Sequence, residues 1–207
     1  PAAAECAAAL ARASERLTQR TGLAPPTGVE IVLFPSASSY HAYHELRGSA
    51  RPEWSTACTA GGRIMLYGAE ADRDQLTGTL GHELTHLTVR GAADGRTVPV
   101  WLDEGLAALV GGQFAEARGV LQRTGLHLAL EALHVPSFAA YEQADAYLAY
   151  ATSRVLVEDL LRAGTGPLGA YLSALGAGAS AEDAFVAAWG VSLADYYAAW
   201  AAALAGA

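Results

Sequence analysis

The sequence predicts an α+β fold, in which a small mixed α/β lobe with a short sheet is followed by a mainly helical lobe. The runs rich in β-branched residues lie before residue 68, so the strands are expected early in the chain. From residue 98 onward, the apolar residues recur only at helical spacing. A chain of 207 residues is long enough for one domain with two subdomains. We therefore predict a single domain, 1–207, with residues 1–75 as the α/β subdomain and 76–207 as the helical one.

The α/β lobe is predicted from its helix stripes, strand runs and turn residues. An apolar stripe in the first segment stops at Gly22, a residue type that commonly ends helices. The clearest strand reads Val-Glu-Ile-Val-Leu-Phe and stops at Pro35. Gly61 and Gly62 separate two further short runs, which predicts a hairpin with a tight turn. The predicted elements are helices over residues 2–21 and 36–46 and strands over 29–34, 53–60 and 63–67.

A helix predicted over residues 76–90 forms the join between the two lobes. Asp72, with Gln75 three residues later, resembles a capping box at its start. A polar turn around Asp94-Gly95 is expected to follow it. Further helices are predicted over residues 100–111, 116–123, 126–134, 145–163, 167–175, 181–189 and 193–204, the last two capped by Ser180 with Asp183 and by Ser192 with Asp195.

Composition and charge limit the possible partners. The formal net charge is −8 and no basic run occurs, which argues against a nucleic-acid partner because phosphate binding needs a basic surface. No apolar run approaches the roughly 20 residues that span a bilayer, so no transmembrane segment is expected in this sequence. The sequence begins at Pro1 and not at Met, so a targeting segment is expected to lie outside it. This leaves the location open but favours an extracellular, periplasmic or cell-envelope protein.

Two cysteines and one histidine pair have structural interpretations. Cys6 and Cys58 are far apart in sequence and have no metal-ligand spacing. In an exported protein they could form one disulfide, and otherwise they are two small buried thiols. His41 and His44 lie three apart on a predicted helix, but no acidic residue accompanies them. We interpret both histidines as surface or partly packed residues.

The pentad His82-Glu83-Leu84-Thr85-His86 lies within the helix at the join. Residues four apart stack about one turn apart on the same helix face, so two imidazole nitrogens can point at one metal ion. This spacing is typical of a zinc site contributed by a single helix. Glu83 lies on the adjacent surface, where it could take a proton from a metal-activated water.

A catalytic zinc site needs a third protein ligand and leaves its fourth position to water. The segment Trp101-Leu102-Asp103-Glu104-Gly105-Leu106-Ala107 carries two acids in an otherwise apolar helix, where an unpaired charge is costly. The preceding turn permits an antiparallel return of this helix against the pentad helix. From the residues alone, either Asp103 or Glu104 could supply the third ligand.

HELTH followed after 14 residues by WLDEGLA, so that 17 residues separate His86 from Glu104, resembles the gluzincin peptidases, in particular the peptidase MA-like domains related to aminopeptidase N. The resemblance implies that His82, His86 and Glu104 bind one zinc ion per chain, and that Glu83 is the general base. It is strongest over residues 77–111. Asp103 is then a candidate to orient a liganding histidine, and a solvent-exposed helix acid is the alternative.

The resemblance also suggests residues outside the two motifs. The hairpin matches the edge strand that borders the cleft in gluzincins and pairs with an extended peptide. Ala149-Tyr150-Ala151-Thr152-Ser153 resembles the Y-x-x-S element, which makes Tyr150 the candidate for stabilising the oxyanion and Tyr147 the reserve choice. His127 and His134 are weaker alternatives, which we interpret as structural.

These observations predict a zinc-dependent metallohydrolase, most specifically a peptidase acting on a peptide or protein substrate. The G-x-M-x-N segment that holds a substrate's free amino terminus in aminopeptidases has no counterpart, since the hairpin reads Gly61-Gly62-Arg63-Ile64-Met65-Leu66-Tyr67. We therefore make no prediction of aminopeptidase activity. The alternative is a catalytically silent module that binds peptides in the same cleft.

Overall fold

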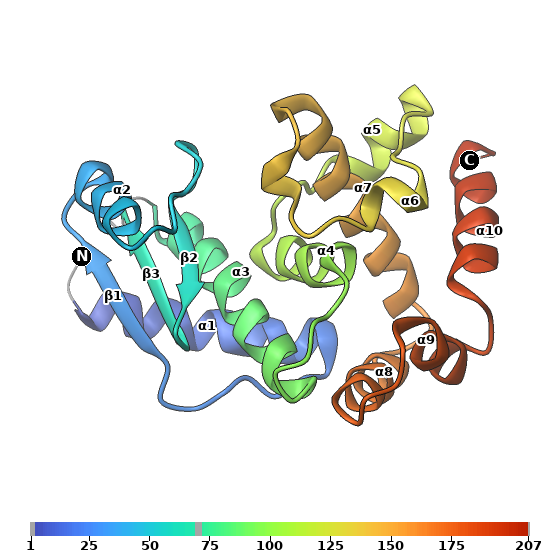
Figure 1. Cartoon of the computed structure of the whole chain (residues 1–207), viewed down its shortest axis with the longest axis horizontal. Coiled ribbons are helices and arrows are strands. Elements are labelled where there is room, and N and C mark those ends of the chain that lie inside the picture. Colours follow the sequence, from blue (N-terminus) through green and yellow to red (C-terminus); the bar gives the residue numbers. More distant parts are fainter. Residues whose placement is uncertain (1–2, 69–71, 207) are drawn as a thin grey trace.

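The computed structural model describes residues 3–68 and 72–206 and confirms the α+β class. A three-stranded sheet and α2 lie at one end of the molecule, and the later helices gather at the other, with α3 between them (Figure 1). The predicted start of the first helix at Ala2 lies outside the described residues. The elements are α1 (Ala3–Thr21), β1 (Glu30–Phe34), α2 (Ala37–Leu46), β2 (Ala57–Ala60), β3 (Arg63–Tyr67), α3 (Arg73–Ala92), α4 (Val100–Gly111), α5 (Ala117–Thr124), α6 (Leu130–Leu133), the 3₁₀ helix η1 (Phe138–Ala140), α7 (Gln143–Leu161), α8 (Gly166–Gly176), α9 (Ala181–Trp189) and α10 (Leu193–Ala205).

The sheet has the order β1-β3-β2, with β1 parallel and β2 antiparallel to β3. Ile31 is in register with Ile64, and Cys58 with Met65. Gly61 and Gly62 form the predicted two-residue turn at φ values of 59° and 77°, the left-handed backbone that tight hairpin turns require. Because β3 occupies the centre, β2 is an edge strand on the side of α3.

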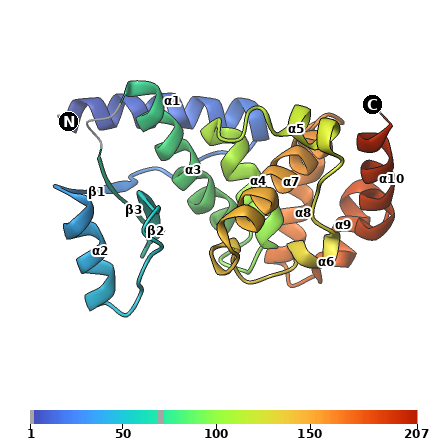
Figure 2. The same cartoon turned by 90° about the horizontal axis from the view of Figure 1, so that it is seen from above.

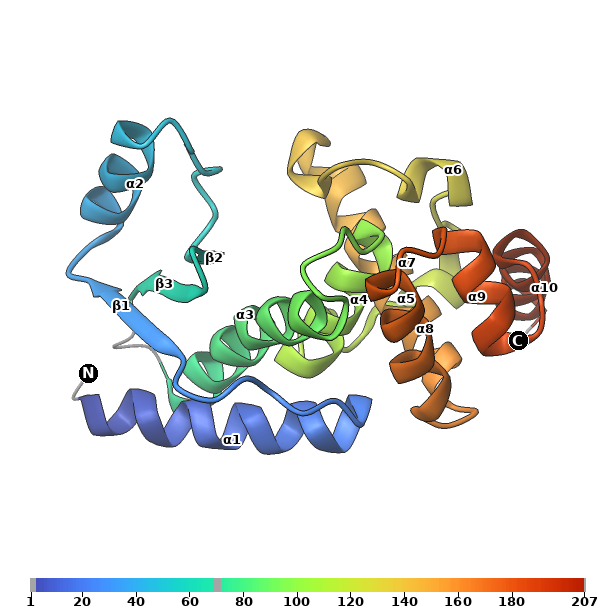
Figure 3. The ribbon, with the colours of Figure 1, turned by 60° about the horizontal axis from the view of Figure 1, so that its bottom comes forward.

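Each face of the sheet has its own apolar packing. Successive side chains of a strand point to opposite faces, so Ile64 and Leu66 join the main core while Met65 packs with Tyr40 of α2. Figure 3 shows α2 and α1 on opposite sides of the sheet. The helix α1, which the sequence groups with the α/β lobe, packs on α3 and α4. The division into residues 1–75 and 76–207 stays a prediction.

Both cysteines are free and buried, which matches the interpretation as two thiols. They belong to different apolar clusters, Cys6 to the main core and Cys58 to the cluster between the sheet and α2. His44 is also buried, so the interpretation of it as a surface or partly packed residue was wrong. Its Nε2 lies 3.3 Å from Cys58 Sγ and its Nδ1 lies 3.3 Å from Ser49 Oγ, contacts that satisfy both ring nitrogens inside the fold.

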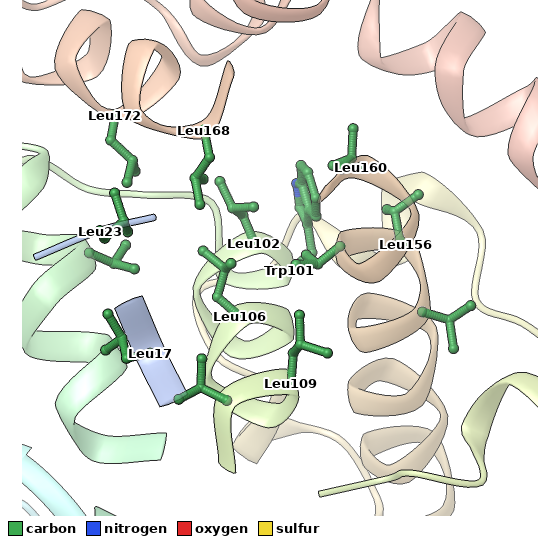
Figure 4. Packing of buried hydrophobic residues seen from close by; sticks show 14 of the residues in the cluster. Leu17, Leu23, Trp101, Leu102, Leu106, Leu109, Leu156, Leu160, Leu168 and Leu172 are labelled. Carbon is green, nitrogen blue, oxygen red and sulfur yellow. The ribbon is translucent and has the colours of Figure 1, made fainter. Parts of the chain in front are cut away.

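The helical lobe is built around α4, which packs against both α3 and α7. In Figure 4, Trp101 lies between α4 and α7, close to Leu160, while Leu102 is directed toward Leu168 of α8. Trp101 and Leu106 are fully buried. Figure 2 shows α10 at the end of the molecule opposite the sheet. Across the described residues, each helix is too short or too polar to cross a membrane.

Glycines allow unusually close helix contacts on both sides of α4. A Cβ atom at Gly105 would lie 2.6 Å from the Ser153 carbonyl oxygen and 2.7 Å from Val157 Cγ2, both on α7. A Cβ atom at Gly78 of α3 would lie 2.6 Å from the Gly111 carbonyl oxygen of α4. These contacts set the spacing of α3, α4 and α7.

Gly105→Ala is expected to destabilise the protein by about 1–3 kcal/mol, because the added methyl group forces α4 away from α7. Gly91→Ala is the matched control: Gly91 also lies in a helix, but nothing would contact its Cβ within 4 Å. This control is expected to be neutral or stabilising by up to about 1 kcal/mol, since alanine has the higher helix propensity. Urea denaturation of both variants measures the difference, and equal stabilities would contradict the close-contact explanation.

Three further local expectations were wrong. The strand predicted over residues 53–60 begins only at Ala57. The helix predicted over residues 126–134 is confined to α6, because tertiary hydrogen bonds engage its first turn: Leu128 N donates to Thr152 Oγ1 at 3.3 Å, and the Tyr197 hydroxyl donates to the Leu128 carbonyl. At the start of α3, the Asp72 side chain accepts a hydrogen bond from Asp74 N. It therefore caps the helix without the predicted capping box with Gln75. The predicted caps Ser180 and Ser192 are confirmed.

Candidate metal centre

The helix α3 presents His82 and His86 on one face, as their four-residue spacing predicts. Their Nε2 atoms lie 3.1 Å apart, and their rings are nearly perpendicular, with an interplanar angle of 81°. The Nε2 atoms thus converge on one point.

The turn after α3 brings α4 back against it, with Asp94 and Gly95 in left-handed backbone at φ values of 49° and 75°. Glu104 on the first half of α4 then places Oε2 3.5 Å from His82 Nε2 and 3.8 Å from His86 Nε2. One ligand atom from each of the three residues lies within 4.8 Å of the others.

These three residues fit a divalent metal ion. Zinc–nitrogen distances of about 2.0–2.1 Å in a tetrahedral site imply ligand atoms roughly 3.3 Å apart, close to the separations of 3.1, 3.5 and 3.8 Å found here. Glu104 Oε2 is also buried without a hydrogen-bond partner among the described residues, an arrangement that is costly unless a cation satisfies it. The cluster can therefore bind a metal ion.

The outer nitrogen of each histidine faces a polar side chain. His86 Nδ1 lies 2.9 Å from Asp103 Oδ1, the arrangement anticipated for Asp103. His82 Nδ1 lies 2.6 Å from Gln113 Oε1, so the amide oxygen accepts the ring proton and directs Nε2 toward the ligand cluster. Sequence reasoning missed Gln113, because nothing in the spacing links it to a residue 31 positions earlier.

Gln113 reaches His82 because α4 ends in a left-handed residue. Gly112 has a φ of 74°, which turns the chain at the end of the helix, and Gln113 N donates to the Ala108 carbonyl at 2.9 Å. Phe114 follows at a φ of 53°, an uncommon conformation for a bulky residue. Its ring stacks on Tyr150, with centroids 5.6 Å apart. This short segment thus supports both His82 and Tyr150.

Burial and mutual charge perturb the four central residues. Burial raises the pKa of Glu83 to about 7 and also raises the pKa of Glu104. Burial, together with the neighbouring His86, lowers the pKa of His82 to about 3. Burial also disfavours charged His86, but the surrounding carboxylates, Asp103 foremost, outweigh it and raise that pKa to about 10. Perturbation of this kind is common where burial and charge are arranged for chemistry.

The raised pKa of Glu83 predicts a pH-dependent stability in the metal-free protein. The unfolded carboxyl ionises near 4.5 and the folded one near 7, so folding becomes less favourable as the pH rises through this window. Below the window both states are protonated, and above it the destabilisation is constant. The stability advantage of Glu83→Gln over wild type should therefore grow as the pH rises from 4.5 to 7. Urea denaturation with chelator across this window tests the sign, and a constant difference would contradict it.

A cavity of about 950 Å³ opens over the ligand cluster. Its wall includes His82, Glu83, Glu104 and Tyr150, together with the edge strand β2. Burial, followed by the charges of Glu104 and Glu83, raises the pKa of Tyr150 well above its usual value, so its hydroxyl stays protonated at neutral pH.

The other residues considered for stabilising the oxyanion lie away from this cavity wall or contact other residues. Tyr147 is 48% exposed, packs on Phe114 and is not part of the cavity wall. His127 Nδ1 lies 3.0 Å from the Tyr197 hydroxyl, and His134 borders a smaller, neighbouring cavity. The structural interpretation of both histidines agrees with these positions.

Comparisons with known proteins identify the family. Searches of curated proteins and of solved structures gave no match. The family model of the peptidase MA superfamily matches residues 9–206, which covers both the sheet and the helical lobe. The chain therefore belongs to the peptidase MA superfamily.

Proposed function

We propose that this protein is a zinc-dependent peptidase of gluzincin type. The observation that carries the proposal is the convergence of His82, His86 and Glu104 within 4.8 Å, with Glu83 on the same cavity wall. Three ligands and an open cavity are typical of catalytic zinc sites, whereas structural sites are closed by four protein ligands.

When bound, a zinc ion would lower the pKa of a water molecule toward about 7 and polarise the substrate carbonyl. Glu83 is the general base in this proposal. Its carboxylate takes the proton from the attacking water and passes it to the leaving amine. Its carboxylate suits both steps because it lies on the cavity wall beside the ligand cluster, where it can reach a water bound there.

Tyr150 is the proposed oxyanion stabiliser. Its ring is held between Phe114, at a centroid distance of 5.6 Å, and Phe138, at 5.3 Å. A protonated hydroxyl on the cavity wall can donate a hydrogen bond to the developing oxyanion. The exposure of Tyr147 and its absence from the cavity wall favour Tyr150 over it.

The edge strand β2 supports a peptide as the substrate. One side of β2 pairs with β3, and its residues form part of the cavity wall. Backbone donors and acceptors of an edge strand can pair with an extended peptide, which would hold the scissile bond beside the metal ligands.

Metal analysis combined with proteolysis tests the proposal. We expect about one zinc ion per chain and cleavage of a denatured protein mixture, with the fragments identified by mass spectrometry. A chelator should stop the cleavage, and added zinc should restore it. Zinc-loaded protein that leaves the mixture intact would contradict the peptidase and favour the peptide-binding alternative.

A further inference from the structure

The charged residues of the cavity wall fall into two groups. The acidic side chains among the described wall residues are Glu83, Asp103 and Glu104, and each already has a place in the proposed centre as base, partner of His86 or ligand. The basic side chains are Arg51, Arg90 and Arg96. Within the described part of the chain, these three arginines form no ion pair, unlike Arg63 and Arg118, which do.

Arg51 lies on the same cavity wall as the proposed base, Glu83. It precedes β2 on the loop from α2. Its Nε atom is buried without a hydrogen-bond partner among the described residues. A buried guanidinium nitrogen without a partner is costly, and a carboxylate in the cavity would satisfy it.

Arg90 lies in the last turn of α3, and Arg96 follows the end of that helix. Arg90 is four residues after His86, so His82, His86 and Arg90 follow one another on a single helix face at one-turn intervals. Arg96 lies on the turn that leads to α4. Both side chains are exposed and border the cavity. The three arginines therefore offer positive charge to a substrate along the cavity wall.

The three arginines of the wall, unpaired among the described residues, belong to a chain whose net charge is −8. Arginines on an acidic protein usually have carboxylates available as partners, and here these three face the cavity without one. The acidic side chains of the wall belong to the proposed metal centre, so the unpaired guanidinium groups are left to attract ligands of negative charge. Arginine also binds carboxylates through two parallel hydrogen bonds, which gives specificity as well as affinity.

We propose that Arg51, Arg90 and Arg96 select substrates that carry a carboxylate near the scissile bond. This inference deepens the proposed peptidase function and rests on the cavity being its substrate site. The carboxylate can come from an aspartate or glutamate side chain or from a free peptide C-terminus. Both sources present the same chemistry to a guanidinium group.

The test compares matched peptides that contain Glu, Gln or Lys at the positions flanking a common core, each with a free or an amidated C-terminus. Cleavage by the zinc-loaded protein gives kcat/KM, and calorimetry with zinc-loaded Glu83→Gln gives binding without turnover. We expect the Glu peptide to be preferred over the Gln peptide by roughly tenfold and the Lys peptide to be the poorest, because charged hydrogen bonds are among the stronger ones.

Replacing Arg51, Arg90 and Arg96 together by glutamine should abolish this preference. The corresponding lysine variants should keep part of it, since charge remains but the paired hydrogen bonds are lost. Arg123→Gln is the control for each single arginine-to-glutamine change, because Arg123 is exposed on α5 and is not part of the cavity wall. Its replacement removes one positive charge outside the cavity. Thermal unfolding of each variant verifies that it is folded.

The outcomes separate this inference from the proposed function. A preference for Glu over Gln that survives amidation assigns the carboxylate to a side chain, whereas faster cleavage of free than of amidated peptides, whatever the flanking residue, assigns it to the C-terminus; both support the inference. Cleavage of all peptides at equal rates, or a preference retained in the triple glutamine variant, would overturn the inference and leave the peptidase standing. Arginine-dependent binding of acidic peptides without any cleavage would support the inference and overturn the peptidase.

Discussion

Glu83→Gln is expected to lower kcat by roughly 10²–10⁴-fold, the usual contribution of a general acid–base residue, while the zinc content is unchanged. Glu83 is buried beside the ligand cluster but is not among the three residues whose ligand atoms converge. Glutamine keeps the size and a hydrogen-bonding oxygen but cannot take a proton from water. The measurement is single-turnover cleavage of a peptide, with metal analysis of the same samples.

Glu45→Gln is the matched control for this variant. Glu45 is exposed on α2 and is not part of the cavity wall, so its replacement removes one negative charge without touching the site. Its kcat should equal that of wild type. Wild-type turnover by Glu83→Gln would eliminate Glu83 as the base, whereas loss of zinc from that variant would show that Glu83 supports the metal site itself.

Glu104→Gln is expected to have the largest effect on metal binding. It removes the only carboxylate among the three ligands of the cluster. Loss of a residue that only orients a ligand lowers the affinity for zinc by roughly 10–100-fold, and loss of Glu104 should lower it further. Cleavage should fall with it. Competition for zinc against a chromogenic chelator measures the affinity without relying on activity.

Asp103→Asn and Gln113→Ala provide the comparison for Glu104→Gln. Each alters the side chain that faces the outer nitrogen of one histidine, at 2.9 Å for Asp103 and 2.6 Å for Gln113, and leaves all three ligands in place. Their zinc affinities should fall by roughly 10–100-fold. If Glu104→Gln binds zinc as tightly as either of them, Glu104 is not a ligand.

The part of the site that follows from local periodicity could be predicted from the sequence. A spacing of four places His82 and His86 on one helix face wherever the helix lies. The turn between two apolar helices makes an antiparallel return the simplest path, and this brings Glu104 to the histidines. The helix α4 occupies the predicted residues 100–111. Here, local pattern and tertiary packing favour the same structure.

The parts that could not be predicted depend on contacts between distant residues. Gln113 meets His82 only because Gly112 reverses the chain in left-handed backbone. The segment before α6 has helical periodicity, but its backbone groups bond to Thr152 and Tyr197 instead. His44 is buried because α2 lies on the sheet against Cys58. In each case a tertiary hydrogen bond or packing contact determines the structure, and the local sequence pattern does not indicate that contact.

The crossing of Gly78 and Gly111 has a consequence for recognising distant relatives. A Cβ atom at Gly111 would lie 3.0 Å from the Gly78 carbonyl oxygen and 3.3 Å from His82 Cβ, so side chains at either position would move the helix that carries the ligands. The two glycines stand at fixed offsets from the pentad and from Glu104. An alignment that weights small residues at these offsets, in addition to the zinc motif, would separate chains with this helix crossing from chance occurrences of the pentad.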